Sequence, residues 1–546
     1  MTQRRLYAFN GGVHLEGHKA VSAVLPIADM PLLPRYVVPL RQHIGEPARA
    51  VVELGQRVLR GELIGRPEGY VSVGVHAPTS GRVVAVEPRP VAHPSGLNDL
   101  CVVIEADGQD RAVDPTPLDW HRMDPSALRN RLREMGLAGL GGAVFPSFIK
   151  LNPGAKRRIP ILILNGAECE PWITCDDMLM RERASEILLG AHVMRHMLGA
   201  ERVLVGIEDN KPQALACMAE AAAGSDVEVV AVPTVYPAGG GKQLTYTLTG
   251  RITPSKGLTT DVGVQVFNVG TAYSLYRAVY LGEPLISRVV TVTGHVGTPR
   301  NLEVRLGSPI LDLLQAAGGE LPGATGEVIG GPMMGFDLHD TSAPVTKAVN
   351  CILVKNADLF PPKPAPMPCI RCGECARACP VELQPYELYW YARHRDFGKT
   401  QSYHLFDCIE CGCCSYVCPS HIPLVDFYRF AKSEVWARER EKQAADLARE
   451  RHEFRTFRLE REKREKAERL AKKAAERLES GAVAADDPQA ERKKALLAAA
   501  IEKAKQAKAG VQPKNVDDLP ADKQREIEAI EARRQQRASM TASADP

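Results

Sequence analysis

The chain has 546 residues, of which 45% are hydrophobic and 25% are charged, and its formal net charge is +3. This length predicts several domains, and the composition is typical of a soluble globular protein. The net charge does not indicate a nucleic-acid partner, and none is expected. The first 15 residues lack an apolar signal-peptide core, and no stretch approaches the roughly 18 to 20 apolar residues of a membrane-spanning helix.

Residues 1–115 are expected to be all-β. Alternating apolar residues in 51–58 and 71–84 are punctuated by Gly, Pro and Ser, which predicts short strands and tight turns. The pattern resembles the barrel-sandwich domains that carry biotin or lipoate on a lysine. There is no lysine between Lys19 and Lys150, so a swinging arm is excluded. A structural or docking role is therefore expected for this domain.

Two mixed domains are expected next, over 120–285 and 286–357. In the first, short apolar runs alternate with helix-like stretches, which favours a mainly parallel sheet with helices on its faces. The second has a strand-like run, a helical run and a turn-rich segment, and fits a small α+β domain. The strand-like runs of the larger domain are 161–164, 203–207, 227–232 and 262–267.

A glycine-rich segment over 136–146 is a candidate anion-binding loop. Gly139, Gly141 and Gly142 allow main-chain N–H groups to approach an anion closely. Lys150 follows shortly after and could pair with a phosphate. Taken alone, such a segment is more often only a turn.

Polar residues follow two of the expected strands. Asn165, Glu168 and Glu170 come after 161–164, and Asn268 ends the last strand-like run. Parallel α/β sheets bind ligands at the carboxyl ends of their strands. Each carboxylate could instead be a helix cap or a turn residue. The combination with the glycine-rich segment favours a flavin or dinucleotide site.

Two cysteine runs over 358–430 follow a proline-rich linker. Both read C-x2-C-x2-C-x3-C-P, the spacing of ferredoxins with two clusters, in which the fourth cysteine of each run binds the other cluster. Structural zinc fits poorly, because zinc sites usually pair shorter C-x2-4-C arms. Two neighbouring clusters predict an electron path rather than structural links. The expected ligands are Cys369, Cys372, Cys375 and Cys418 for one [4Fe-4S] cluster and Cys408, Cys411, Cys414 and Cys379 for the other.

The other six cysteines form no disulfide framework, which fits a reducing cytoplasm. One of them, Cys413, lies inside the second run but would break its spacing as a ligand. From 431 to 546 the chain is rich in Ala, Glu, Lys and Arg. A charged helix with i,i+4 pairs is expected over 460–479, and disorder over 510–546. Either a solvated tail or a contact to partner subunits or acidic lipid fits this region.

Three segments resemble the flavin-bearing, NADH-oxidising subunit of respiratory complex I. They are the glycine-rich 139–146, the Asn-to-Pro segment 165–171 and the Asn-to-Thr segment 268–271. With the barrel-sandwich front and the two ferredoxin motifs, about residues 5–430 resemble the RnfC family, whose members belong to Rnf (Rsx) ion-translocating electron-transport complexes. Segments 42–45 and 234–240 also carry this resemblance.

The resemblance implies a multidomain α/β and α+β protein: a barrel-sandwich hybrid domain, a Rossmann-like FMN/NAD(H) domain, a soluble-ligand-binding β-grasp domain and a 2x[4Fe-4S] module. It implies FMN, NAD(H) and two clusters on a peripheral subunit at the cytoplasmic side of the inner membrane. Its partners would be other subunits of the complex and a ferredoxin-type carrier, with H+ or Na+ translocated. Glu168 and Glu170 would be catalytic at the nicotinamide–flavin interface, and FMN would be held by Gly139, Gly141, Gly142, Lys150, Asn165 and Asn268.

The chain departs from the family patterns at three positions. Leu140 and Val144 stand where complex I has arginine and glycine, and Gly241 stands where glutamate is expected. These departures keep open a non-catalytic iron–sulfur relay and docking scaffold. A soluble NADH dehydrogenase or hydrogenase flavin subunit is a further alternative, but the barrel-sandwich front and the two-ferredoxin ending argue against it.

Overall fold

The computed structural model describes residues 4–154, 157–362 and 364–479, with a few single residues between 492 and 502. The chain divides into two units, one ending at Arg440 and one beginning at Glu441. Among the described helices, none combines the length and the apolar character that crossing a membrane requires.

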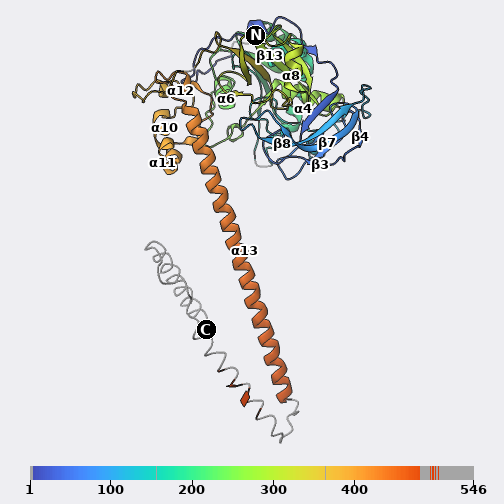
Figure 1. The fold of residues 1–546 in the computed structure, drawn as a ribbon, viewed down its shortest axis with the longest axis vertical. Helices are drawn as coiled ribbons and strands as arrows, with labels where there is room; N and C mark the ends of the chain where they lie inside the picture. The colour runs from blue at the N-terminus through green and yellow to red at the C-terminus, as the bar shows by residue number, and fades with distance from the viewer. Residues whose placement is uncertain are drawn as a thin grey trace. The chain divides into compact units, whose positions relative to one another are not determined.

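The N-terminal domain consists of two small antiparallel sheets, and their strands lie together in the blue region of Figure 1. The apolar faces of both sheets enclose one core that includes Tyr36, Ile64 and Ile104. This agrees with the expected barrel-sandwich character. One sheet has the order β2 (Arg35–Pro39), β8 (Asn98–Ala106), β7 (Gly81–Pro90), β4 (Arg57–Val58), and the other β3 (Arg49–Ala50), β5 (Leu63–Arg66), β6 (Val75–His76).

The central domain is a four-stranded sheet in which all strands are parallel. Alternate residues of the inner strand β9 (Ile161–Gly166) face opposite sides: Leu162 and Leu164 pack in one core, and Ile161 and Ile163 in another. Both faces are therefore covered, as expected for a Rossmann-like domain. The strand order is β11 (Val227–Val232), β10 (Arg202–Glu208), β9, β12 (Val264–Asn268). The helices are α1 (Pro125–Glu134), α2 (Ser147–Lys150), α3 (Cys175–Glu182), α4 (Ala184–Leu198), α5 (Pro212–Ala221), α6 (Gly241–Thr249) and α7 (Val269–Tyr280), with η2 (Thr259–Val262) before β12.

The small domain is a six-stranded mixed sheet with α8 (Ile310–Ala316) packed on it. Its edge strand β1 (Ala28–Asp29) comes from the N-terminal region and pairs parallel to β14. The short helix η1 (Lys19–Val21) precedes this strand, so the N-terminal segment contacts other domains before it enters its own. The strand order is β1, β14 (Arg300–Arg305), β13 (Ser287–Gly294), β17 (Cys351–Asn356), β15 (Ala324–Ile329), β16 (Phe336–Asp337).

The cysteine-rich module is helical. Its elements are α9 (Glu374–Arg377), α10 (Pro385–Arg393), α11 (Phe397–Ser402), η3 (Leu405–Asp407), α12 (Cys413–Tyr416) and the start of α13 (Leu424–Glu479). The helix predicted over 460–479 is confirmed, but the observed helix is longer, since α13 begins at Leu424. Its first turns bury Val425, Tyr428 and Val435 in the core of the module. Farther along, Arg458–Glu462 and two similar i,i+4 pairs occur as predicted. The segment 510–546, expected to be disordered, lies outside the described residues.

Candidate cofactor sites

The glycine-rich loop lies at the carboxyl end of β12, against Asn268 and Thr271. Gly139 N donates to Phe145 O at 2.8 Å, which closes the loop. A Cβ on Gly141 would lie 3.0 Å from the Asn268 side chain, so a larger residue would fit only if that side chain shifted slightly. Gly142 is exposed, has a φ of 58° and faces open space. The outer edge of the loop is therefore bare main chain, which fits a group that approaches closely.

Two departures from the family pattern point into the protein. Leu140 and Val144 are 7% and 5% exposed. The main chain of Leu140 is held on both sides, because its N–H donates to the Thr271 hydroxyl and its carbonyl accepts from Arg288. Val144 has a φ of 44°, a conformation that β-branched residues rarely adopt and glycine adopts freely. Neither side chain obstructs the exposed edge of the loop.

The two candidate asparagines are direct neighbours. Asn268 and Asn165 occupy paired positions on β12 and β9. Asn165 Nδ2 donates to Gly239 O at 2.8 Å. Asn268 Oδ1 accepts from Gly270 N at 2.8 Å and caps α7, while Nδ2 donates to Asp176 at 2.6 Å. The structure thus brings Asn165, Asn268 and the glycine-rich loop together.

Lys150 is directed toward β12 and away from the outer edge of the loop. Its ammonium donates to Val266 O and lies 4.4 Å from the centre of the Phe267 ring. Burial lowers the pKa of Lys150 to about 8. The lysine supports the strand beneath the loop, and no local sequence pattern indicates this contact.

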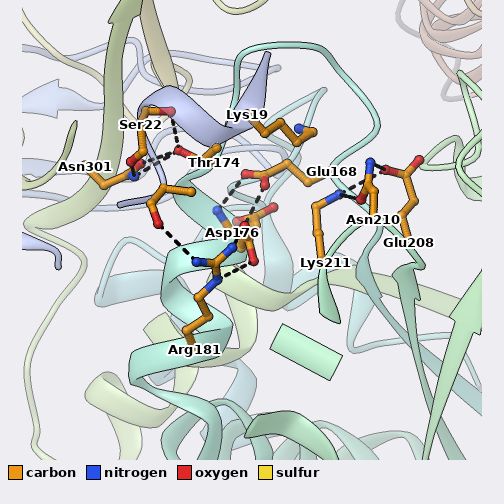
Figure 2. A network of polar contacts seen from close by, with 12 residues as sticks. Lys19, Ser22, Glu168, Thr174, Asp176, Arg181, Glu208, Asn210, Lys211 and Asn301 are labelled. Atoms are coloured by element: carbon orange, nitrogen blue, oxygen red, sulfur yellow. Dashed lines mark hydrogen bonds and ion pairs between the residues drawn. The ribbon is translucent and has the colours of Figure 1, made fainter. Parts of the chain in front are cut away.

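Glu168 caps α3 (Figure 2). Its carboxylate accepts from Asp176 N at 2.7 Å and from Asp177 N at 3.2 Å. Burial raises the pKa of Glu168 to about 8, and the charge of Lys19 opposes that rise. The Cys175 thiol also donates to this carboxylate, at 3.5 Å. A carboxylate has about four lone-pair sites, so about one remains for a ligand. The residue has a φ of 49°, a strained conformation of the kind found at functional sites.

Glu170 is directed toward the small domain. Its Oε1 accepts from Met333 N at 2.7 Å and from Met334 N at 3.1 Å. A Cβ on Gly331 would lie 2.2 Å from Glu170 Cγ, so this glycine allows the close approach. Burial raises the pKa of Glu170, and these amides lower it. The two glutamates therefore have different surroundings: Glu168 caps a helix, and Glu170 joins two domains.

The eight cysteines of the two runs line two separate cavities. The fourth cysteine of each run lies in the cavity of the other run, in the crossed arrangement that the spacing predicts. None of these eight cysteines forms a disulfide. The first cavity is lined by Cys369, Cys372, Cys375 and Cys418, and the second by Cys379, Cys408, Cys411 and Cys414.

The two runs have matching backbones, which supports one cluster in each cavity. Arg371 and Glu410, at equivalent positions, have φ values of 54° and 57°. Gly373 and Gly412 follow with 80° and 83°, and each precedes a four-residue helix. The donor set in each cavity is four thiols without a carboxylate or histidine, which suits iron–sulfur ligation. Cys413 is fully buried and does not line the second cavity.

The second cavity is packed against the central and small domains. Tyr236 Oη donates to Cys411 O at 2.7 Å, and Gln243 Nε2 donates to Pro380 O at 3.2 Å. A Cβ on Gly412 would lie 2.9 Å from Met333 O, so the cysteine loop directly contacts the segment that holds Glu170. Sequence reasoning singled out segment 234–240 but missed these roles, because the contacts join residues more than 100 positions apart.

The first cavity opens at the surface. Cys369 and Cys372 are exposed, and Ile370, which lines the cavity between them, is 69% exposed. In the second cavity, Cys379, Cys411 and Cys414 are buried and Cys408 is half-buried. The two otherwise similar sites therefore differ in their access to other proteins.

Four family models match successive parts of the chain. They are the RnfC barrel sandwich hybrid domain over 7–109, the Nuo51 FMN-binding domain over 132–277, an SLBB domain over 289–337 and a 4Fe-4S dicluster domain over 368–422. These matches define an iron–sulfur flavoprotein of the complex I type. They confirm the predicted fold class and the predicted cofactors FMN and [4Fe-4S].

Curated relatives identify the family. The three relatives described here carry the name of the C component of an ion-translocating oxidoreductase complex. The chain is 46% identical over 456 residues to the one from Pseudomonas aeruginosa, covering 83% of this chain and 59% of that relative. Those from Citrobacter koseri and Salmonella gallinarum are 42% and 44% identical, with 99% of this chain covered in both and 76% and 79% of the relatives. The chain belongs to this family, the RnfC family of ion-translocating oxidoreductase complexes.

Similarity to solved structures is low. The crystal structure of an NAD+-reducing [NiFe]-hydrogenase in the H2-reduced state aligns with a TM-score of 0.40 and 19% identity, over 59% of this chain and 63% of that chain. This similarity is too low to define a shared fold.

Proposed function

We propose that this chain is the peripheral electron-input subunit of a membrane-bound oxidoreductase complex that translocates H+ or Na+. It would move electrons between NAD(H), FMN and two [4Fe-4S] clusters on the cytoplasmic side of the inner membrane. Its relatives are named as subunits of ion-translocating complexes. The remaining partners would be the other subunits and a ferredoxin-type carrier. The observation that carries the proposal is the contact between the second cysteine loop and the candidate flavin domain.

The candidate flavin site is built from the glycine-rich loop and the two asparagines. Gly141 and Gly142 present main chain at the exposed edge, and Asn165 and Asn268 form the floor beneath it. Bound FMN would supply the exchange between two-electron and one-electron chemistry that NAD(H) and the clusters require. The side chains of Leu140 and Val144 pack beneath the loop and exclude water from its inner side. These features support flavin binding more than the relay alternative.

The carboxylate loop, residues 168–174, would contribute to the NAD(H) site. Glu168 has about one free lone-pair site and a pKa of about 8, so its charge changes near neutral pH. An ionised carboxylate attracts the positive charge of an oxidised nicotinamide ring. Glu170 fixes the loop to Met333 and Met334 and holds it against the small domain. Gly241 begins α6 and faces open space, so no side chain blocks the site there.

The two cavities would act in series. The second lies against the flavin domain, where Tyr236 and Gln243 hold its ligand loop. The first is exposed, and it would exchange electrons with a partner protein. In the opposite order, the flavin would pass electrons to the exposed first cavity before the second. Within the described residues, no contact as buried as that of Tyr236 joins the first cavity to the flavin domain.

Cofactor content and NADH reduction test the proposed function together. The full chain is purified without oxygen, and its FMN and iron are measured. We expect about one FMN and about eight irons per chain, and loss of flavin absorbance on adding NADH. A chain that holds iron but takes up no FMN on reconstitution, and does not respond to NADH, would be the relay and docking scaffold.

A further inference from the structure

A segment of the N-terminal domain crosses the carboxylate loop. This Lys19 segment, residues 17–22, contacts the loop through both main chain and side chains. Trp172 N donates to Gly17 O at 2.8 Å, and the His18 ring stacks on the Trp172 indole with centroids 4.4 Å apart. At its far end the Ser22 hydroxyl lies 2.9 Å from that of Thr174. The loop is thus covered by a segment from outside its own domain.

The crossing is anchored in the small domain as well. Asn301 Nδ2 donates to Ser22 O and to the Thr174 hydroxyl, each at 2.9 Å. Figure 2 shows these contacts. Both Ser22 and Thr174 are fully buried. A polar network buried this completely fixes the position of its members, because a broken bond would leave an unpaired polar group. The Lys19 segment, the carboxylate loop and the small domain therefore form one rigid junction.

Lys19 is the charged member of this junction. Its ammonium donates to Glu170 O at 2.9 Å and to Ile173 O at 2.5 Å, two main-chain carbonyls of the carboxylate loop. Figure 2 shows Glu168 between Lys19 and Lys211. Lys211 is paired with the Glu208 carboxylate at 2.9 Å, whereas the hydrogen bonds of the Lys19 ammonium go to neutral main-chain carbonyls, which leave its positive charge uncompensated.

The charges of Lys19 and Glu168 influence each other's ionisation. Burial raises the pKa of Glu168, and Lys19 is the charge that opposes this rise most strongly. Burial lowers the pKa of Lys19 itself, and Glu168 opposes that change. Each charge therefore favours the ionised form of the other. The titratable and charged groups that face Glu168 are Lys19, Cys175, Asp176, Asp177, Lys211 and Cys351.

We propose that Lys19 is a positioning residue of the NAD(H) site, through which the N-terminal domain fixes the carboxylate loop and sets the charge of Glu168. This inference rests on the proposed function. The N-terminal domain would then have a second role beside docking, because its Lys19 segment would complete the NAD(H) site. Lys19 holds the loop through two carbonyls, and the same ammonium stabilises the carboxylate.

Binding of NAD+ to the full chain, measured by calorimetry as a function of pH, tests the proposal. Wild-type affinity should rise through an inflection near pH 8, because ionised Glu168 attracts the cationic nicotinamide. Glu168→Gln should remove the inflection. Lys19→Gln can still donate to carbonyls but has no charge, and should move the inflection up by about one pH unit. Lys19→Arg should keep the wild-type inflection.

Two control variants separate charge from structure. Lys355→Met removes a remote lysine that pairs with Asp337, and should leave binding unchanged. His18→Ala removes the ring stack but leaves the charge, and should weaken binding equally at every pH. An inflection in K19Q that stays near pH 8, or a K19Q chain that loses its folded fluorescence signal, overturns the charge-setting role. Absence of NAD+ binding in the wild type would instead reject the proposed function.

Discussion

The two cysteine cavities have nearly the same local structure and very different surroundings. Both runs repeat the same backbone turns, and each cavity is lined by four cysteines. The second cavity is buried against the flavin domain, whereas the first has two exposed cysteines. Local sequence therefore makes the cluster site, and long-range packing decides what each site exchanges electrons with. The predictions below test this difference.

The largest effect is expected from Cys411→Ser, which removes a ligand of the second cavity. About four of eight irons should be lost, and NADH should still bleach the flavin but no longer reduce the first cluster. Iron analysis and EPR after NADH addition measure this. Dithionite should still reduce the remaining cluster, which controls for its integrity. Normal reduction of the first cluster by NADH would show that the order is wrong.

Cys372→Ser, in the first cavity, is the matched opposite case. About four irons should again be lost, but NADH should still reduce the remaining cluster, because that cluster lies next to the flavin domain. Electron transfer to the partner subunits should stop. EPR of the NADH-reduced variant measures the first result, and carrier reduction in membranes measures the second. If NADH reduced the remaining cluster equally in Cys372→Ser and Cys411→Ser, the proposed difference between the two cavities would be wrong.

Tyr236→Phe tests the contact that joins the second cavity to the flavin domain. The variant leaves the Cys411 carbonyl without its buried partner, which costs about 1 to 3 kcal/mol. The urea midpoint for loss of the iron–sulfur absorbance should fall, and NADH-driven cluster reduction should slow several-fold at unchanged flavin bleaching. Stopped-flow absorbance separates the two steps. A variant with wild-type rates for both steps would remove Tyr236 from the path.

The smallest effect is expected at the surface of the first cavity. Ile370→Glu places a charge on an apolar rim residue that is 69% exposed, so folding and NADH oxidation with a small artificial acceptor should not change. Transfer to partner subunits should fall several-fold, because a buried charge opposes docking. Leu97→Glu is the matched control, since Leu97 is also 69% exposed but lies in the N-terminal domain. Equal effects of both variants would contradict a docking surface at Ile370.

Sequence patterns predicted the features that depend on residues close together in the chain. The alternation of apolar runs with helix-like stretches predicted the parallel sheet, and the cysteine spacing predicted the crossed sets that the cavities bring together. Asn165 and Asn268 could be placed near each other because strand ends share one edge of a sheet. These inferences need only the periodicity of a strand or the reach of a short loop.

Contacts between distant parts of the chain were not predictable. Nothing near Lys19 indicates that it contacts residues 170 and 173, and nothing near Tyr236 indicates Cys411. That Lys150 and Glu170 lie at a ligand stays a prediction, and their protein contacts were not foreseen: Lys150 with the Val266 carbonyl on β12, and Glu170 with the amides of Met333 and Met334. Such positions depend on domain packing, which no single segment specifies.

The central claim is that the second cluster site receives electrons from the flavin before the first. Freeze-quench EPR of the NADH-reduced wild-type chain tests it most directly, with the spectra of C372S and C411S as references for each cluster. The signal retained in C372S should appear first, and the signal retained in C411S should follow. Earlier appearance of the signal retained in C411S would contradict the claim.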